Sequence, residues 1–168
     1  MSYWESLGKS DDWYTPETVF DALGCRFDMD VAGDPCAPGN SVPAFATITY
    51  GSLEHDWRGF VWMNPPFGGR NGIVPWLDTF IAHGNGIALT PDRTSAPWFQ
   101  AAMPHMDAVL FTRKIRFLRP DGTEGKSPSN GTALMAIGDR GVAALIRAAE
   151  GGFGILLQPS RATPERNL

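Results

Sequence analysis

The spacing of apolar and polar residues divides most of the chain into alternating strand and helix segments. Compact apolar runs predict strands, at residues 27–32, 46–50, 59–63, 86–90 and 108–111. Helical spacing and helix start signals predict helices between them, at residues 16–23, 74–83 and 95–103. Such alternation is typical of an α/β fold with a mostly parallel sheet that helices cover on both faces.

The last third of the chain has a different pattern. Residues 114–118 alternate charged and apolar side chains, and Pro120-Asp121-Gly122 is a turn signal. A strand over 132–137, a helix over 142–149 and a strand over 153–157 follow. This order predicts an antiparallel hairpin at the C-terminal side of the sheet.

Length and composition favour one domain. The chain has 168 residues, of which 43% are apolar, so it can bury a substantial core. We expect a polar arm at 1–12, a domain at 13–158 and a tail at 159–168. The N-terminus lacks the basic and apolar regions of a signal peptide, and no apolar run approaches the roughly 20 residues that a bilayer requires. We therefore expect an intracellular protein with no membrane partner.

Charge is unevenly distributed along the chain. Residues 1–58 contain 10 acidic and 3 basic side chains, a net charge of −7, whereas the remainder has a net charge of +3. Five basic residues are close together in the second part: Arg113, Lys114, Arg116, Arg119 and Lys126. If they share one face they can bind an anionic polymer, although a solvated, charged edge strand is the alternative.

One short segment combines backbone rigidity with hydrogen-bond acceptors. Asn64-Pro65-Pro66-Phe67 directly follows the apolar run 59–63, and open α/β sheets bind ligands outside the carboxyl ends of their strands. Consecutive prolines restrict two φ angles and remove two backbone donors, so the turn presents carbonyl oxygens. An Asn oxygen beside a backbone carbonyl suits a planar NH₂ group, and Phe67 adds a flat apolar surface. The segment predicts either a pocket for a nucleobase or amide, or merely a stiffened strand exit.

Metal chemistry has no support in the sequence. His55, His83 and His105 lack the spacing of metal ligands, and Cys25 and Cys36 form no cluster with them. We therefore expect no metal site.

Several segments, in a fixed order, resemble a known enzyme family. Asn64-Pro65-Pro66-Phe67 resembles the (D/N)-P-P-(Y/F) motif of amino methyltransferases that use S-adenosylmethionine. Trp13-Tyr14-Thr15-Pro16 is similar to the W-Y-T-P element of phage-type DNA N6-adenine methyltransferases, the Dam family. Residues 27–32 are similar to that family's F-D-x-D-V-A segment, and residues 89–99 to its L-x-P-x-R-T-x-x-x-W-F pattern. The resemblance covers roughly residues 12–138.

The resemblance implies a fold, a cofactor and residues that bind it. The fold is the Rossmann-like class I methyltransferase fold, and the cofactor is S-adenosylmethionine. The implied cofactor-binding residues are Trp13, Tyr14, Thr15, Pro16, Asp30, Val31, Ala32 and Asn64. The segment after residue 29 departs from the usual glycine-rich loop, so either Asp30 or Asp34 could face the cofactor. Asp30 is preferred because it ends the apolar strand.

The implied activity is N6-methylation of adenine in DNA. The implied catalytic residues are Asn64, Pro65, Pro66 and Phe67. Asn64 Oδ1 and the Pro65 carbonyl would accept the two hydrogens of the amine, and Phe67 would stack on the flipped base. The resemblance also implies a phage or prophage protein that acts in the cytoplasm of a bacterial host.

DNA is the implied partner, with a short or loose target sequence, because the chain has no room for a large recognition domain. The residues assigned to DNA are Arg113, Lys114, Arg116, Arg119, Lys126 and Asn130. Two other functions stay open. One is methylation of another planar NH₂ group, such as cytosine N4, RNA adenine or a glutamine amide. The other is a catalytically silent module that binds the cofactor or DNA.

Overall fold

The computed structural model describes residues 13–34, 36–48, 53–66, 72–126, 128 and 130–159. The predicted arm at 1–12 and all but the first residue of the predicted tail lie outside this part of the chain. The helices are α1 (Glu17–Leu23), α2 (Val74–His83), α3 (Pro97–Ala102), the 3₁₀ helix η1 (Met103–His105) and α4 (Asp139–Glu150). The strands are β1 (Phe27–Asp30), β2 (Ala44–Thr47), β3 (Val61–Met63), β4 (Gly86–Pro91), β5 (Ala108–Thr112), β6 (Thr132–Ile137) and β7 (Gly154–Leu157).

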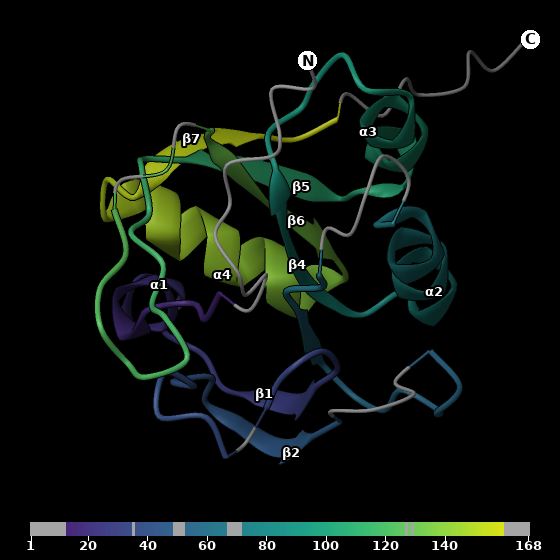
Figure 1. Cartoon of the computed structure of the whole chain (residues 1–168). Helices are drawn as coiled ribbons and strands as arrows, with labels where there is room; N and C mark the ends of the chain where they lie inside the picture. The colour runs from purple at the N-terminus through teal and green to yellow at the C-terminus, as the bar shows by residue number, and fades with distance from the viewer. Residues whose placement is uncertain are drawn as a thin grey trace, which may run out of the picture.

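The strands form one seven-stranded sheet in the order β2-β1-β3-β4-β6-β5-β7 (Figure 1). The four strands β2, β1, β3 and β4 pair in parallel. Strand β6 is antiparallel to both β4 and β5, and β7 is antiparallel to β5. The expected change from parallel to antiparallel pairing is confirmed, but the antiparallel part includes three pairings rather than one hairpin.

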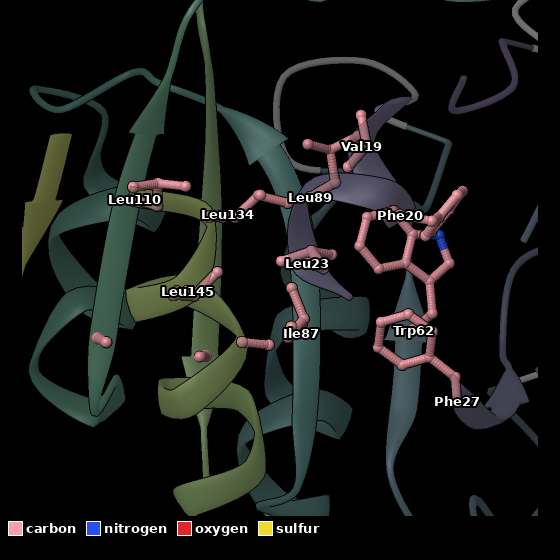
Figure 2. Close-up of a cluster of buried hydrophobic side chains, with 14 of the residues drawn as sticks. Val19, Phe20, Leu23, Phe27, Trp62, Ile87, Leu89, Leu110, Leu134 and Leu145 are labelled. Carbon is pink, nitrogen blue, oxygen red and sulfur yellow. The ribbon is translucent and has the colours of Figure 1, made fainter. Parts of the chain in front are cut away.

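Helices cover both faces of the sheet, as the alternating pattern predicted (Figure 1). Helices α1 and α4 pack on one face, where Trp62 lies edge-on against Phe20 with ring centroids 4.9 Å apart. Figure 2 shows this cluster, to which Leu145 of α4 also contributes. Helices α2 and α3 pack on the other face, against Val61 and Met63. Neighbouring residues of β3 therefore enter different cores, which explains its continuous apolar sequence.

Local sequence accounts for the limits of α1. Pro16 precedes the helix in an extended conformation, and Gly24 ends it in the left-handed region at φ 59°. At this end of α1, the Arg147 guanidinium of α4 donates to the Leu23 carbonyl at 2.6 Å. A cation is favourable here because the carbonyls at the end of a helix carry a partial negative charge. This contact joins the two helices that share one face.

The alternating segment at residues 114–118 is not part of the sheet. Only Leu118 makes isolated antiparallel bridges, one with Tyr14 and one with Glu124. Strand β7 occupies the position beside β5, so the charged segment does not pair with β5. Instead it lies in the connection between β5 and β6, and Ile115 enters the core on the α1 side. The predicted turn at Pro120-Asp121-Gly122 is confirmed, because the antiparallel bridge between Leu118 and Glu124 closes around it. The alternating segment nevertheless adds no strand to the sheet, since alternation alone does not specify a pairing partner.

Among the described helices the longest is α4, with 12 residues, and none of them has the length and apolar character to cross a membrane.

Candidate functional site

The candidate site residues converge at one edge of the sheet. Strands β1, β3 and β4 run in the same direction, so the residues that follow them lie at a common edge. Strand β5 has the same direction, because β4 and β5 are both antiparallel to β6. Asp30 ends β1, Asn64 follows β3 and Arg113 follows β5. Parallel topology therefore brings the predicted cofactor, catalytic and DNA-binding segments to one side of the molecule.

Asn64 has a defined amide orientation. Its Nδ2 donates to Thr15 Oγ1 at 3.2 Å and to the Trp13 carbonyl at 3.4 Å. No described residue donates a hydrogen bond to its Oδ1. Pro65 is buried and Pro66 is exposed, whereas Phe67 lies outside the described residues. The side chain thus uses its donors inside the protein, and its acceptor has no partner among the described residues.

The segment at residues 13–16 is attached to two loops. The Tyr14 and Leu118 backbones exchange two hydrogen bonds, each 2.9 Å long. Ser41 Oγ donates to the Thr15 carbonyl at 2.7 Å, and Thr15 is only 2% exposed. The structure therefore brings Trp13 and Thr15, predicted from the sequence as cofactor residues, into direct contact with Asn64.

Asp30 is a buried carboxyl with one unpartnered oxygen. It is 1% exposed; its Oδ1 accepts from the Ala32 backbone at 3.2 Å, and its Oδ2 has no hydrogen-bond partner. Burial raises the pKa of Asp30 to about 7, and the Ala32 hydrogen bond opposes this shift. Gly33 passes so close that a Cβ there would lie 1.9 Å from Oδ2. A buried acceptor without a partner is costly, and such groups concentrate at binding sites.

Asp34 has a different environment from Asp30. Its Oδ1 accepts from the Cys36 backbone at 2.9 Å, and its carbonyl accepts from Asn40 Nδ2 at 2.8 Å. The Asp34 side chain therefore stabilises a turn, whereas one oxygen of Asp30 has no hydrogen-bond partner. This contrast favours Asp30 over Asp34 as the acid for a ligand.

Thr90 was not singled out from the sequence. It lies in β4, is fully buried, and its Oγ1 has no hydrogen-bond partner. Asp30 Oδ2 and Thr90 Oγ1 are the buried side-chain polar atoms without a partner in the described part of the chain, and they lie on the two strands that flank β3. A threonine in an otherwise apolar run just before Pro91 was the available signal.

The basic residues lie in the connection from β5 to β6. All are exposed, as is Asn130: Arg113, Lys114, Arg116, Arg119 and Lys126. Arg119 supports the loop itself, because it donates to Thr123 Oγ1 at 3.1 Å and to the Glu124 carbonyl at 2.7 Å. Arg116 pairs with Glu124 at 3.4 Å, but both side chains are more than half exposed, and such pairs contribute only about 0–1 kcal/mol. Arg116 can therefore exchange this partner for a phosphate.

A groove of about 320 Å³ lies elsewhere, between α2 and α3. Its lining comes from these helices and η1: Val74, Leu77, Asp78, Ile81, Ala82, Trp98, Ala101, Ala102 and His105. Asn64 and Asp30 do not line it. Within the described ranges, no group of three or more His, Cys, Asp or Glu side chains is placed to hold a metal ion.

Comparison with known proteins identifies a family. A family model described as DNA N-6-adenine-methyltransferase (Dam) matches residues 6–148. No curated protein and no solved structure matches the chain.

Proposed function

Because the chain belongs to the DNA N-6-adenine-methyltransferase (Dam) family and is thus an enzyme that methylates adenine in DNA, we propose that Asn64 and Pro65 form its catalytic centre. The observation that carries this proposal is the orientation of the Asn64 amide. Its Nδ2 is bound to Thr15 and Trp13, so Oδ1 is the atom left to meet a substrate amine. The position directly after β3, at the common carboxyl edge, also supports the assignment.

The proposed mechanism begins with a poor nucleophile. The lone pair of adenine N6 is delocalised into the ring. Asn64 Oδ1 and the Pro65 carbonyl each accept a hydrogen bond from the amine. These two hydrogen bonds favour a pyramidal nitrogen as positive charge develops on it. Since these acceptors are already in place, they stabilise the transition state without reorganising. Correct positioning of the two reactants supplies much of the remaining rate enhancement.

S-adenosylmethionine is the methyl donor that the family implies, and the residues at the edge of the sheet fit it. The buried Asp30 Oδ2 lacks a partner and can accept from a hydroxyl or amine. Gly33 passes so close to this carboxyl that a side chain at that position would collide with Asp30 Oδ2. We assign cofactor binding to residues 13–16, to Asp30, Val31 and Ala32, and to Asn64. When bound, the cofactor supplies an electrophilic methyl group on a sulfonium.

We further propose that the sheet is a class I methyltransferase sheet of the Rossmann-like type. The support is its strand order, in which an antiparallel strand, β6, is inserted between the parallel strands β4 and β5. The position of Asp30 and Asn64 after neighbouring strands agrees with this assignment.

DNA contact is proposed for the connection between β5 and β6. Arg113, Arg116 and Lys126 are exposed at the same edge as Asn64, and phosphates are the natural partners of such side chains. Arg119 supports the loop that presents them, while Lys114 and Asn130 extend the surface. The adenine must leave the duplex to reach Asn64, and Phe67 is proposed to stack on it. The family resemblance supports a phage or prophage enzyme that acts in the host cytoplasm.

A transfer assay with product identification tests this function. The protein is incubated with S-adenosylmethionine carrying a labelled methyl group and with adenine-rich duplex, cytosine-rich duplex or RNA, and the nucleosides are then separated. We expect the label in N6-methyladenine from DNA. Label in N4-methylcytosine or in RNA would refute the assigned substrate. Cofactor binding without any transfer would instead indicate a silent binding module.

A further inference from the structure

We propose that Thr15 and the Trp13 carbonyl are positioning groups that hold the Asn64 amide with Oδ1 toward the substrate, and that they require Asn rather than Asp at this position. The inference rests on the proposed role of Asn64. It starts from the two contacts of Nδ2, at 3.2 Å to Thr15 Oγ1 and 3.4 Å to the Trp13 carbonyl. Thr15 and Asn64 are 49 positions apart in the chain, so this contact forms only when the chain folds.

The two partners have different effects on the amide. A hydroxyl can donate or accept, so Thr15 alone tolerates either orientation of the amide. A carbonyl can only accept, so a flipped amide would place Oδ1 against the Trp13 oxygen with no hydrogen between them. The carbonyl therefore selects the orientation, and the Thr15 hydroxyl holds the amide in place. The protein thus orients Asn64 Oδ1 toward the substrate before the base binds.

The segment that carries these groups does not depend on the Thr15 hydroxyl for its position. Its backbone is joined to Leu118 through Tyr14, and Ser41 Oγ binds the Thr15 carbonyl. Thr15 is 2% exposed, so a side chain of the same shape can replace it without opening the site to water. Loss of the hydroxyl should therefore change the amide and leave the segment in place.

The same contacts make the exchange of Asn64 for aspartate unfavourable. An ionised carboxylate has no hydrogen to donate, so it would face the Trp13 carbonyl as a second acceptor. A protonated carboxyl can donate and would restore the contact. The N64D variant should thus become more active relative to the wild type as the pH falls.

The first experiment separates the hydroxyl from the segment. In T15V we expect kcat to fall about tenfold, because one hydrogen bond to the catalytic side chain is lost, while the KM for DNA stays within twofold and the Kd for S-adenosylmethionine rises by a smaller factor than kcat falls. T15S keeps the hydroxyl and should retain kcat within about threefold. S41A removes a hydrogen bond to Thr15 without touching the amide and should also stay within about threefold. A loss in S41A or T15S equal to that in T15V would overturn the proposal.

The second experiment compares N64D with the wild type at each pH between 5.5 and 8.5. We expect a ratio of N64D to wild-type kcat that rises at least fivefold toward acidic pH. A ratio that does not change with pH, or N64D activity equal to the wild type at pH 8, would overturn the proposed selection of Asn.

An NMR measurement tests the positioning without any methyl transfer. In ¹⁵N-labelled protein the two Asn64 Nδ2 protons should have separate, protected signals that move toward free-amide values in T15V but not in S41A. If the wild type transfers no methyl group yet these signals behave as expected, the proposed function fails and the positioning stands. Unshifted signals in T15V would contradict the positioning itself.

Discussion

The two edges of the sheet use their polar groups in opposite ways. At the amino edge, Asp28 Oδ2 accepts from the Phe60 backbone at 2.7 Å and from Arg140 at 3.3 Å. The Gly59 carbonyl there accepts from Asn85 Nδ2 at 3.0 Å and from His83 Nε2 at 2.8 Å. At the carboxyl edge, Asp30 Oδ2 is buried without a partner and no described residue donates to Asn64 Oδ1.

This difference separates stability from function within one sheet. Polar groups at the amino edge satisfy one another and fasten loops to strands, which stabilises the fold. Polar groups at the carboxyl edge keep their acceptors open at a cost to stability, as binding sites commonly do. Matched substitutions of the same residue type at the two edges should therefore have opposite consequences.

Substitution of the two asparagines, Asn64 and Asn85, should give the largest difference between the two edges in kcat and stability. N64A removes the proposed acceptor for the amine and should lower kcat about 10²–10³-fold, by analogy with the loss of one preorganised group in other active sites. The Tm should change little, and the Kd for S-adenosylmethionine should rise by a much smaller factor than kcat falls. N85A removes a hydrogen bond to Gly59 and should lower stability by about 1 kcal/mol with kcat unchanged. Kinetics and thermal unfolding of both proteins measure this; full activity in N64A would refute its catalytic role.

The aspartates should differ in stability and in its pH dependence. The pKa of Asp30 is raised to about 7, so the folded state keeps a proton that the unfolded state releases between pH 4 and 7. Wild-type stability therefore falls over that range. D30N should be more stable than the wild type above pH 7, by about 4 kcal/mol at most, and equal to it near pH 4.

D30N should also bind S-adenosylmethionine more weakly, since the proposed acceptor loses its charge. The control is D28N, which should lower stability by about 1–2 kcal/mol and leave cofactor binding intact, because Asp28 binds Phe60 and Arg140. Denaturant unfolding at pH 4 and pH 8, with calorimetric titration of the cofactor, measures both variants. A stability gain in D30N that is the same at both pH values would contradict the raised pKa.

The glycines should show a smaller effect of the same kind. Gly59 has φ +67°, and a Cβ there would lie 2.5 Å from Asp28 Oδ2, so G59A should cost about 1–3 kcal/mol of stability without changing cofactor affinity. In G33A the added Cβ meets the Asp30 carboxyl and should weaken cofactor binding at least tenfold. Tm values and calorimetric Kd values test the pair. Unchanged cofactor affinity in G33A would contradict the assignment of the loop after β1 to the cofactor site.

The arginines should give the smallest change. Arg113 is exposed at the carboxyl edge, so R113A should reduce the slope of log K for DNA against log salt by about one unit, because one phosphate contact is lost. Arg26 precedes β1 at the amino edge, where it stacks over Phe45, and R26A should leave the slope unchanged. Fluorescence anisotropy with a labelled duplex at several salt concentrations measures both slopes. Equal slopes in R113A and the wild type would contradict a phosphate contact of Arg113 and favour a merely solvated surface.

Local sequence determined most of the elements of this protein and pointed to its candidate site residues. Apolar runs identified six of the strands at nearly their observed limits, and Asn64 and Asp30 were assigned to strand ends from the residues around them. The weakest strand was predicted at 46–50 and lies at Ala44–Thr47, because its half-exposed residues give little periodic signal. The start of α4 at Asp139 rather than residue 142 also escaped prediction, since its first turn is polar.

Long-range packing, which no local pattern contains, sets which of these residues meet. The contact of Asn64 with Thr15 depends on how α1 and β3 pack, and no pattern within either segment contains that information. The same holds for the buried, unpartnered Thr90. It holds also for residues 114–118, whose alternation suits a strand but which pair with no strand of the sheet. Periodicity reports which face of an element is apolar; pairing and amide orientation follow from long-range packing and hydrogen-bond partners, which the chain acquires only on folding.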